Sequence, residues 1–226
     1  MPAFTGEPIA ARLMERYSLP IVIDNDAVCA AIAEHAVGAG AGADSLLHVT
    51  LGTGIGTAFL IDGVQIRSGD GRQQEAGHIS VPGAWPCYCG RRSCWEQAAS
   101  RLALQRTASR FLGLSVSDQT ALPELARRAN AGEPDPIAIF SDYGCRVADG
   151  LGTLLAVYRP GRVVLGGSAA EFLPFYRDSL DQALQGLGDW ISRPTIVKTQ
   201  LDDYGGAIGA ALLAQRAIGG TRGVID

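Results

Sequence analysis

A segment rich in cysteine is the feature that most restricts how this chain of 226 residues can fold. Residues 77–96 read GHISVPGAWPCYCGRRSCWE and bring His78, Cys87, Cys89 and Cys94 into one short span. Three thiolates and one imidazole form the donor set of a closed, tetrahedral structural zinc site. A disulfide would leave one of the three cysteines unpaired, and a C-x-C pair is a poor bridge. The spacing therefore favours structural zinc over a disulfide or a loop of packed thiols.

The composition indicates a reduced, globular protein. The five cysteines are an odd number, and Cys29 and Cys145, outside the cluster, are expected to be small buried hydrophobic residues. The net charge is −4 and no basic run occurs, which speaks against a nucleic-acid surface within this chain. No apolar run could span a bilayer, and the first residues lack the apolar core of a signal peptide. The expected location is the cytoplasm, with no membrane partner.

Hydrophobic periodicity predicts alternating strands and helices, and therefore the α/β class. A turn at Asp62-Gly63 is expected to form a hairpin. Strands are expected at 21–23, 46–51 and 56–60, at the start of the segment 162–171 ahead of a glycine corner and a helix start, and in the segment 195–201. Helices are expected at 6–17, 27–40, 94–113, 122–132, 135–158 and 205–219.

Acidic residues and a glycine-rich turn are the other candidates for chemistry. Asp26 follows the strand expected at 21–23 and opens a helix, where negative charge is favoured, so it can serve as a base or only as a helix cap. Asp24 is a rival base, but strand alternation would turn it away. The turn GTGIG at 52–56 suits close approach of backbone amides to phosphate, and it suits a tight hairpin equally well. His35 and His48 are expected to be surface or core residues.

Six motifs occur in one order along the chain, and together they resemble the ROK family of bacterial sugar kinases and sugar-responsive repressors. The cysteine-rich segment behind E-x-G-H is the most specific of the six. The motifs are NDA at 25–27, LGTGIG at 51–56, EAGHI at 75–79, CYCGRRSCWE at 87–96, RPGRVVLGG at 159–167 and YGGAIGAALLA at 204–214.

The resemblance implies one lobe of an actin-like, ribonuclease H-like ATPase fold with a structural zinc loop. Residues 1–44 would be a remnant of the N-terminal small lobe and hinge, and 45–226 the C-terminal large lobe. The helix at 205–219 would return toward the small lobe. Family kinases also carry a D-x-G-G-T phosphate loop ahead of NDA, and no such motif occurs here. The chain is therefore expected to be inactive unless the remaining lobe is supplied.

The resemblance also implies a role for each motif residue. Asp26 would be the base that takes the proton from the attacking hydroxyl. Asn25, Asp26, Glu75, His78 and Glu96 would bind the sugar. His78, Cys87, Cys89 and Cys94 would hold structural Zn²⁺, which would fix Glu75 and Glu96 on either side of the loop. ATP would bind with Mg²⁺, its phosphates at Gly52, Thr53 and Gly54 and its adenosine at Gly166 and Gly167.

The function implied by the resemblance is ATP-dependent phosphorylation of a hexose or N-acyl-hexosamine hydroxyl, in a glucokinase-like protein that forms a homodimer. The alternative is the sugar-sensing part of a transcriptional repressor. A zinc-stapled interaction domain is a third reading of the residues alone. The partners implied are a small-molecule sugar and ATP.

Overall fold

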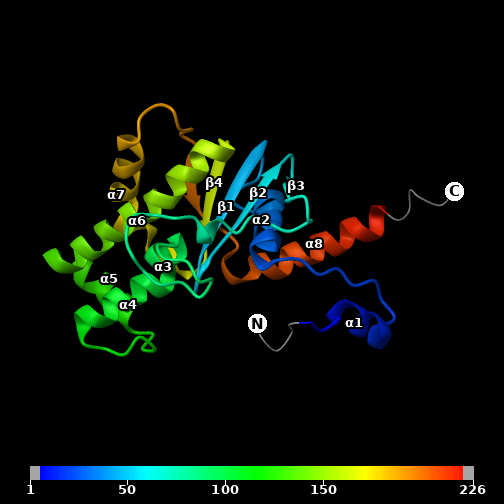
Figure 1. Ribbon diagram of the computed structural model, residues 1–226, viewed down its shortest axis with the longest axis horizontal. Helices are drawn as coiled ribbons and strands as arrows, with labels where there is room; N and C mark the ends of the chain where they lie inside the picture. Colours follow the sequence, from blue (N-terminus) through cyan, green and yellow to red (C-terminus); the bar gives the residue numbers. More distant parts are fainter. Residues whose placement is uncertain (1–5, 221–226) are drawn as a thin grey trace.

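The computed structural model describes residues 6–220 and is built around a mixed five-stranded sheet (Figure 1). The strand order is β3-β2-β1-β4-β5, with β1, β4 and β5 parallel and β2 antiparallel to its neighbours. Asp62 and Gly63 both take positive φ in the β2–β3 turn, as a two-residue hairpin requires. The predicted α/β class and the hairpin are confirmed. The strands are β1 (Ser45–Leu51), β2 (Ile55–Ile61), β3 (Val64–Gln65), β4 (Arg162–Gly166) and β5 (Thr195–Lys198).

Helices cover both faces of the sheet. One face carries α2 and α8, and the other carries α3 to α7 (Figure 1). Within the described residues, no helix is both long enough and apolar enough to cross a membrane. The α-helices are α1 (Ile9–Tyr17), α2 (Asp26–Val37), α3 (Trp95–Ala99), α4 (Arg101–Leu112), α5 (Ala121–Asn130), α6 (Pro134–Tyr158), α7 (Leu173–Gly186) and α8 (Gly205–Gly220); the 3₁₀ turns are η2 (Ala76–His78), η3 (Ser168–Phe172) and η4 (Asp202–Tyr204).

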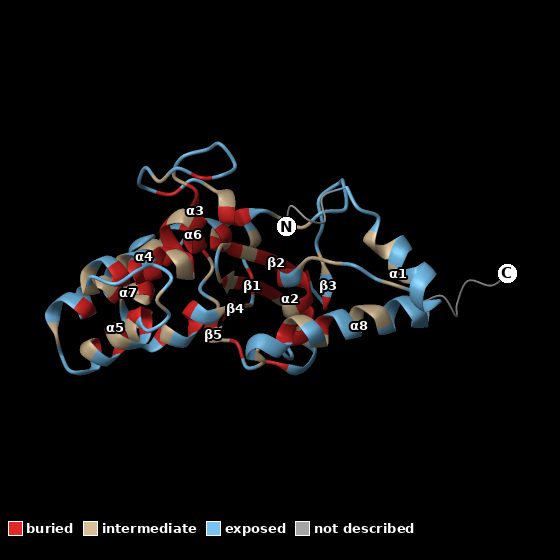
Figure 2. Ribbon diagram, turned by 90° about the horizontal axis from the view of Figure 1, so that it is seen from below, coloured by how far each residue is buried: buried red, intermediate tan, exposed pale blue. Residues whose placement is uncertain are grey.

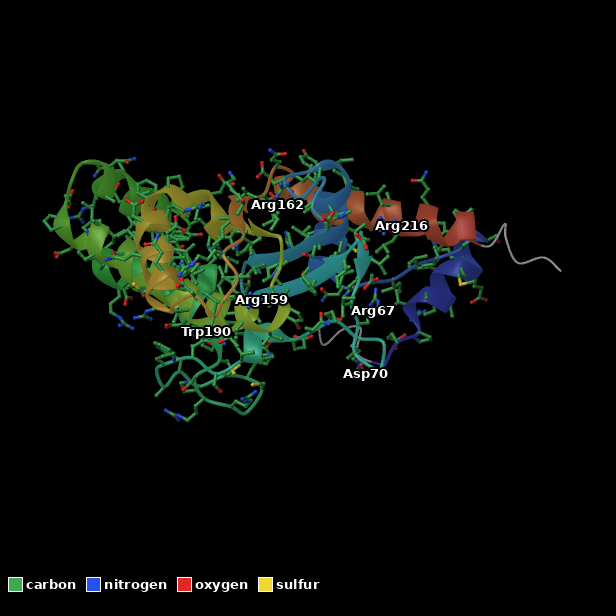
Figure 3. The ribbon with its side chains drawn as sticks, turned by 90° about the horizontal axis from the view of Figure 1, so that it is seen from above. Arg67, Asp70, Arg159, Arg162, Trp190 and Arg216 are labelled. Carbon is green, nitrogen blue, oxygen red and sulfur yellow. The ribbon has the colours of Figure 1, made fainter. Side chains whose placement is uncertain are left out.

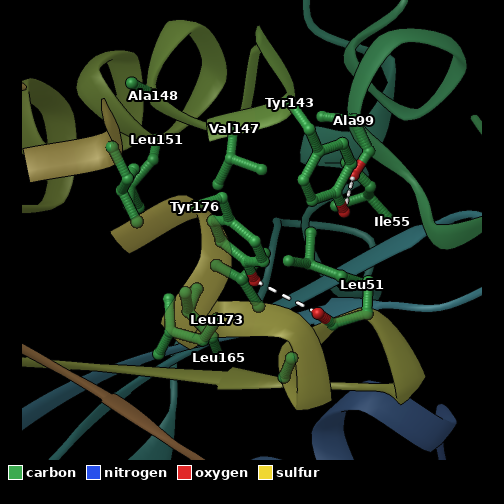
Figure 4. Packing of buried hydrophobic residues seen from close by; sticks show 14 of the residues in the cluster. Leu51, Ile55, Ala99, Tyr143, Val147, Ala148, Leu151, Leu165, Leu173 and Tyr176 are labelled. Carbon is green, nitrogen blue, oxygen red and sulfur yellow. Dashed lines mark hydrogen bonds between the residues drawn. The ribbon is translucent and has the colours of Figure 1, made fainter. Parts of the chain in front are cut away.

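Alternation along the strands divides the core into two layers, because successive side chains point to opposite faces. Leu47, Val49 and Leu51 of β1 join the larger cluster, beneath α3 to α7. Leu46 joins the smaller cluster, which packs against α2. Figure 2 shows buried residues gathered where helices meet the sheet, and Figure 4 shows part of the larger cluster, where the Tyr143 hydroxyl donates to a backbone carbonyl.

The alanine-rich helix α2 permits a very close approach of α8. A Cβ at Gly209 of α8 would overlap the backbone carbonyl of Cys29, so this contact requires glycine. Further along α8, Arg216 donates to the carbonyl of Gly63 at 3.0 Å, which ties the helix to the β2–β3 turn (Figure 3). The pair α2 and α8 therefore forms one rigid layer beside the sheet.

The predictions for residues 21–23 and for Cys145 are wrong. Residues 21–23 form no strand: Val22 and Ile23 are exposed, and no neighbouring strand of the described chain hydrogen-bonds to them. An apolar run becomes a strand only where a partner satisfies its backbone groups. Cys145 on α6 is exposed rather than buried, whereas Cys29 is buried as expected.

A buried carboxylate joins α2 to the chain that follows β5. Glu34 is 1% exposed. Its Oε1 accepts hydrogen bonds from the Thr199 hydroxyl and from the N–H groups of Gln200 and Leu201, both at 3.2 Å. Its Oε2 accepts from the N–H of Ala39 at 2.7 Å. One side chain thus fixes the end of α2 and the segment that leads into α8.

Replacing Glu34 by alanine is expected to lower the free energy of unfolding by about 3 kcal/mol, since one buried and three part-buried donors lose their acceptor together. Urea denaturation measures the change. Glu124→Ala is the matched control, because Glu124 is an exposed acid paired with Arg127 at 2.7 Å and such pairs contribute about 1 kcal/mol or less. Equal losses in the two variants would contradict a structural role for Glu34.

Candidate functional site

A cavity of about 310 Å³ lies where the N-terminus of α2 meets the β1–β2 turn and the cysteine-rich loop. Asp26, Glu75 and Glu96 line it together, although up to 70 residues separate them in sequence. Three carboxylates and no cationic side chain face this space. Such a lining suits a neutral ligand with many hydroxyl groups, because carboxylates are strong hydrogen-bond acceptors. Its other lining residues are Ala27, Thr50, Gly52, Thr53, Gly54, Ile55, Gly56 and Tyr88.

Two of the predicted site residues, Asn25 and Asp26, lie at the start of α2 and have different roles there. Asn25 is the N-cap, and its Oδ1 accepts from the N–H groups of Ala27 and Val28 at 3.0 and 3.3 Å. Its oxygen is therefore engaged in capping, and the residue does not line the cavity. Asp26 is the first helical residue, and its Oδ1 accepts from the Ala27 N–H at 2.8 Å. Asp26 thus has a fixed orientation at the edge of the cavity.

Asp24, the rival base, is engaged elsewhere. Its carboxylate forms an ion pair with Arg67 and accepts the N–H of Asn25 at 2.8 Å. It does not line the cavity. Asp24 lies on no strand, so the alternation that was expected to turn it away does not apply. Its ion pair with Arg67 still leaves Asp26, not Asp24, as the carboxylate at the cavity.

The glycine turn between β1 and β2 forms another wall. The N–H of Gly52 donates to the Gly54 carbonyl at 3.0 Å, which closes the turn. The N–H groups of Thr53 and Gly54 have no protein acceptor among the described residues, so they are available to an anion. A Cβ at Gly54 would lie 2.7 Å from Glu96 Oε2, so the close packing of turn and carboxylate requires glycine here.

The predicted metal ligands converge. One donor atom from each of His78, Cys87, Cys89 and Cys94 lies within 4.8 Å of every other. The Cys89 and Cys94 sulfurs are 3.6 Å apart, and Cys87 Sγ is 3.6 Å from His78 Nδ1. Donors held about 2.1–2.3 Å from one tetrahedral ion lie about 3.4–3.8 Å apart, so these residues fit zinc. None of these cysteines is in a disulfide.

The loop that carries these donors has little core of its own. Its backbone is held by isolated bridges between Ser80 and Cys94 and between Pro86 and Arg92. Arg91 donates to the His78 carbonyl at 3.1 Å. At the end of the loop Trp95 is fully buried, and its indole N–H donates to an α6 carbonyl at 3.0 Å. The loop is therefore anchored by Trp95 at its end and by Val81 and Trp85 against the larger core, and its tip at 86–92 depends on the cysteine and histidine donors.

Glu96 joins the metal cluster to the cavity. It is 5% exposed, and its Oε1 accepts from the Cys87 thiol at 3.3 Å and lies 3.7 Å from His78 Nδ1. Its Oε2 is the atom beside Gly54. One carboxylate thus contacts both sites, so the loop and the cavity cannot move independently.

Tyr88 is a lining residue that the sequence did not reveal. It sits inside the C-x-C pair, its ring lines the cavity, and its hydroxyl lies 3.3 Å from His78 Nε2. His78 itself does not line the cavity, and its ring contacts the Tyr88 ring edge-on at 5.3 Å. Tyr88 therefore occupies the position through which His78 would reach a ligand.

A second cavity of about 260 Å³ shares Asp26, Ala27 and Thr50 with the first. Gly166 and Gly167 line this second cavity, not the first. Gly167 has φ +73°, and a Cβ there would lie 2.6 Å from the Leu51 backbone, so only glycine fits. Its other lining residues are Ala30, Glu34, His48, Thr199, Asp202, Asp203, Gly205 and Gly206.

His48 in this second cavity is a core histidine held neutral. Burial lowers its pKa to about 4, outweighing the opposing effects of Glu34 and Asp26 on α2. Its Nδ1 lies 3.3 Å from the Thr50 hydroxyl.

Acidification is expected to destabilise the protein through His48. His48 binds a proton near pH 6.5 in the unfolded chain but only near pH 4 in the native state. The stability that neutral His48 contributes is therefore fully present above about pH 6.5 and is lost as the pH falls to about 4. The loss should be about 3 kcal/mol. Urea denaturation across this range measures it. His48→Gln should flatten the slope and His35→Gln, the control, should not; equal slopes in all three proteins would contradict the prediction.

A third and larger cavity, of about 560 Å³, begins at the same glycine turn and extends along α4. Gly52 and Thr53 line it, and so does Ser168, which follows Gly167 in the sequence. The first and third cavities therefore meet at this turn, and the second adjoins the first through Asp26, Ala27 and Thr50. The remaining lining residues are Arg101, Gln105, Gln119, Leu122, Pro123, Glu171 and Phe172.

The α/β fold matches solved structures of ROK sugar kinases. The crystal structure of a ROK family glucokinase from Streptomyces griseus, in complex with glucose and AMPPNP, superposes with a TM-score of 0.80 at 33% identity, covering 93% of this chain and 73% of that one. The chain matches the ROK family over residues 2–217 and belongs to that family.

Related sequences include both kinases and a regulator. The glucokinase of Streptomyces coelicolor is 32% identical over 227 residues, covering 92% of this chain and 71% of the relative. The N-acetyl-D-glucosamine kinase of Yersinia pseudotuberculosis is 30% identical over 226 residues, covering 94% and 72%. The xylose repressor of Bacillus subtilis is 27% identical over 173 residues, covering 76% and 44%. Of these three relatives, the two kinases have the higher identity to this chain.

Proposed function

We propose that the protein transfers a phosphoryl group from ATP to a hydroxyl group of glucose or of an N-acylated hexosamine. The observation that carries this proposal is the cavity in which Asp26, Glu75 and Glu96 face the same space as the Gly52–Gly54 turn. An acceptor for hydroxyl groups thus adjoins backbone donors for phosphate. The glucokinases and the N-acetylglucosamine kinase among the relatives support the same substrate class.

Asp26 is the group placed to accept the proton of the attacking hydroxyl. Its Oδ1 is oriented by the Ala27 N–H, and the start of α2 stabilises its negative charge. Glu75 and Glu96 hold other sugar hydroxyls, so that the reactive one stays beside Asp26. Phosphoryl transfer demands mainly alignment and charge stabilisation from the protein, and this arrangement supplies the alignment.

The donor nucleotide lies along the glycine turn. The N–H groups of Thr53 and Gly54 contact its phosphates, and the third cavity, which passes Ser168 next to Gly167, holds its nucleoside. The Mg²⁺ that accompanies ATP neutralises phosphate charge when it is bound. Gly52 shapes the turn rather than donating, because its own N–H is already paired within the turn.

Zinc has a structural role in this proposal. His78, Cys87, Cys89 and Cys94 would hold it, and four protein donors leave no position for water or substrate. A bound ion would clamp the loop and thereby hold Tyr88 and Glu96 at the sugar cavity. The division into lobes at 1–44 and 45–226, whose outer ends lie outside the described residues, and the homodimer remain predictions.

The decisive experiment measures ADP formation with a panel of hexoses and N-acyl-hexosamines, alongside calorimetric binding of the same sugars. The proposal expects sugar binding by this chain, and ADP formation once any lobe that the chain lacks is supplied. Sugar binding without ADP formation from any hexose in the complete protein would overturn the kinase assignment and favour the sugar-sensing function, as in the xylose repressor. Absence of sugar binding would overturn both functions.

A further inference from the structure

One wall of the first cavity contains a side chain to which the proposed reaction gives no role. Residues 75–96 contribute three lining side chains to this cavity, those of Glu75, Tyr88 and Glu96. The two ionised carboxylates can only accept hydrogen bonds, whereas a phenolic hydroxyl can donate one. Within the described chain, Tyr88 is therefore the side chain of this wall that can donate to a ligand.

The two ring nitrogens of His78 face different groups, and this decides how the Tyr88 hydroxyl is used. Nδ1 lies 3.6 Å from Cys87 Sγ, on the side of the metal donors, and Nε2 lies 3.3 Å from the Tyr88 hydroxyl. Zinc held at Nδ1 would leave the ring proton on Nε2, because a neutral imidazole carries a single N–H. The ring would then donate to the Tyr88 oxygen, so the hydroxyl proton of Tyr88 stays available to a ligand.

The ring of Tyr88 extends from a tightly closed turn. Two hydrogen bonds of Cys87 close this turn: its N–H donates to the Arg91 carbonyl at 2.9 Å, and its carbonyl accepts from the Gly90 N–H at 3.0 Å. Tyr88 itself is 81% exposed, so the side chain is open to a ligand while its backbone is held. An apolar group of a ligand that covered this ring would gain favourable contact, because the ring is a large apolar surface.

We propose that Tyr88 is the residue by which this site recognises the N-acyl group of a hexosamine, its hydroxyl donating to the acyl carbonyl and its ring packing against the acyl methyl. A carbonyl oxygen that faced only Glu75 and Glu96 would have no donor, and an unpaired acceptor is costly. A sugar hydroxyl has no such need, since it can donate to either carboxylate. This inference rests on the proposed function and names N-acylated hexosamines as ligands of the cavity.

Calorimetric titration with N-acetylglucosamine and with glucose tests the inference without requiring catalysis. Tyr88→Phe removes the donor and keeps the ring, so it should weaken N-acetylglucosamine binding about tenfold, the effect of one hydrogen bond, and glucose binding less than about twofold. Tyr88→Ala also removes the ring and should weaken N-acetylglucosamine about threefold further. The glucose titration is an internal check, because a disturbed loop would displace Glu96 and weaken both sugars.

Tyr204→Phe is the matched control, since Tyr204 is a 76% exposed tyrosine that does not line the cavity, and it should change neither affinity. Equal losses for the two sugars in Tyr88→Phe, or no loss for either, would overturn the inference. Wild-type protein that binds glucose but not N-acetylglucosamine would also overturn it and leave the proposed kinase function standing. Failure of the wild-type protein to bind any sugar would overturn both the inference and the proposed function.

Discussion

Replacement of Asp26 by asparagine is expected to lower kcat for sugar phosphorylation about a thousandfold, within the range of roughly 10²–10⁴ typical of a general base. Asparagine keeps the size and one oxygen of the side chain. This oxygen can still accept a hydrogen bond from the Ala27 N–H, so the start of α2 should stay intact. Sugar affinity should change less than about tenfold, since Glu75 and Glu96 still line the cavity. Steady-state kinetics of the complete protein and calorimetric sugar binding separate the two quantities.

Asp24→Asn is the matched control, because Asp24 is two residues away but pairs with Arg67 outside the cavity. It should keep kcat within about tenfold of wild type. A large loss of kcat in Asp24→Asn and a small one in Asp26→Asn would reverse the assignment of the base. A parallel loss of sugar affinity and kcat in Asp26→Asn would make Asp26 a binding residue rather than a base.

Much of the fold could be predicted because its core elements have strong patterns. The strand expected at 46–51 became Ser45–Leu51, since alternate residues there face two different helical layers. The helix expected at 135–158 became Pro134–Tyr158, which begins at a proline, as helices often do. In both cases local pattern and tertiary burial agree, so local pattern was sufficient.

The misassigned elements depend on partners that a local pattern does not contain. The apolar residues at 21–23 read as a strand, but no strand of the described chain pairs with them. The stretch 94–113 read as continuously helical, yet it divides at Ser100. That residue has ψ 163°, and its hydroxyl accepts from the Ala103 N–H at 3.2 Å, which caps a new helix. A serine within an alanine-rich stretch gives only a weak signal of such a break.

The same distinction applies to the site. Residues that ligand chemistry requires could be predicted from the sequence, whereas residues that act through packing contacts could not. The metal donors were predictable, because zinc requires particular residue types at close spacing and the four donors converge. Tyr88 was not predictable. An aromatic residue within C-x-C has no required role, and its contact with His78 becomes visible only when its neighbours are placed. The sugar-binding role of Asn25 stays a prediction, although its oxygen caps α2 and the residue does not line the first cavity.

Replacement of Cys89 by serine is expected to weaken zinc binding by more than the roughly 10- to 100-fold that loss of a supporting partner costs, because a direct ligand is removed. Cys89 is exposed and does not line the sugar cavity, so its sulfur has no packing or substrate role to lose. Amide hydrogen exchange across residues 80–94 should accelerate, since the backbone bridges that remain in this loop are few. Native mass spectrometry reports the metal content.

Sugar affinity decides whether the metal acts as a clamp. If zinc positions the loop, Cys89→Ser should weaken glucose binding although the substituted atom touches no part of the cavity, because Tyr88 and Glu96 lose their fixed positions together. Cys145→Ser, an exposed cysteine on α6, is the control and should alter neither zinc content nor sugar affinity. Loss of zinc with unchanged glucose affinity would mean that the anchor at Trp95 holds the cavity by itself. A wild-type protein without zinc would contradict the clamp altogether.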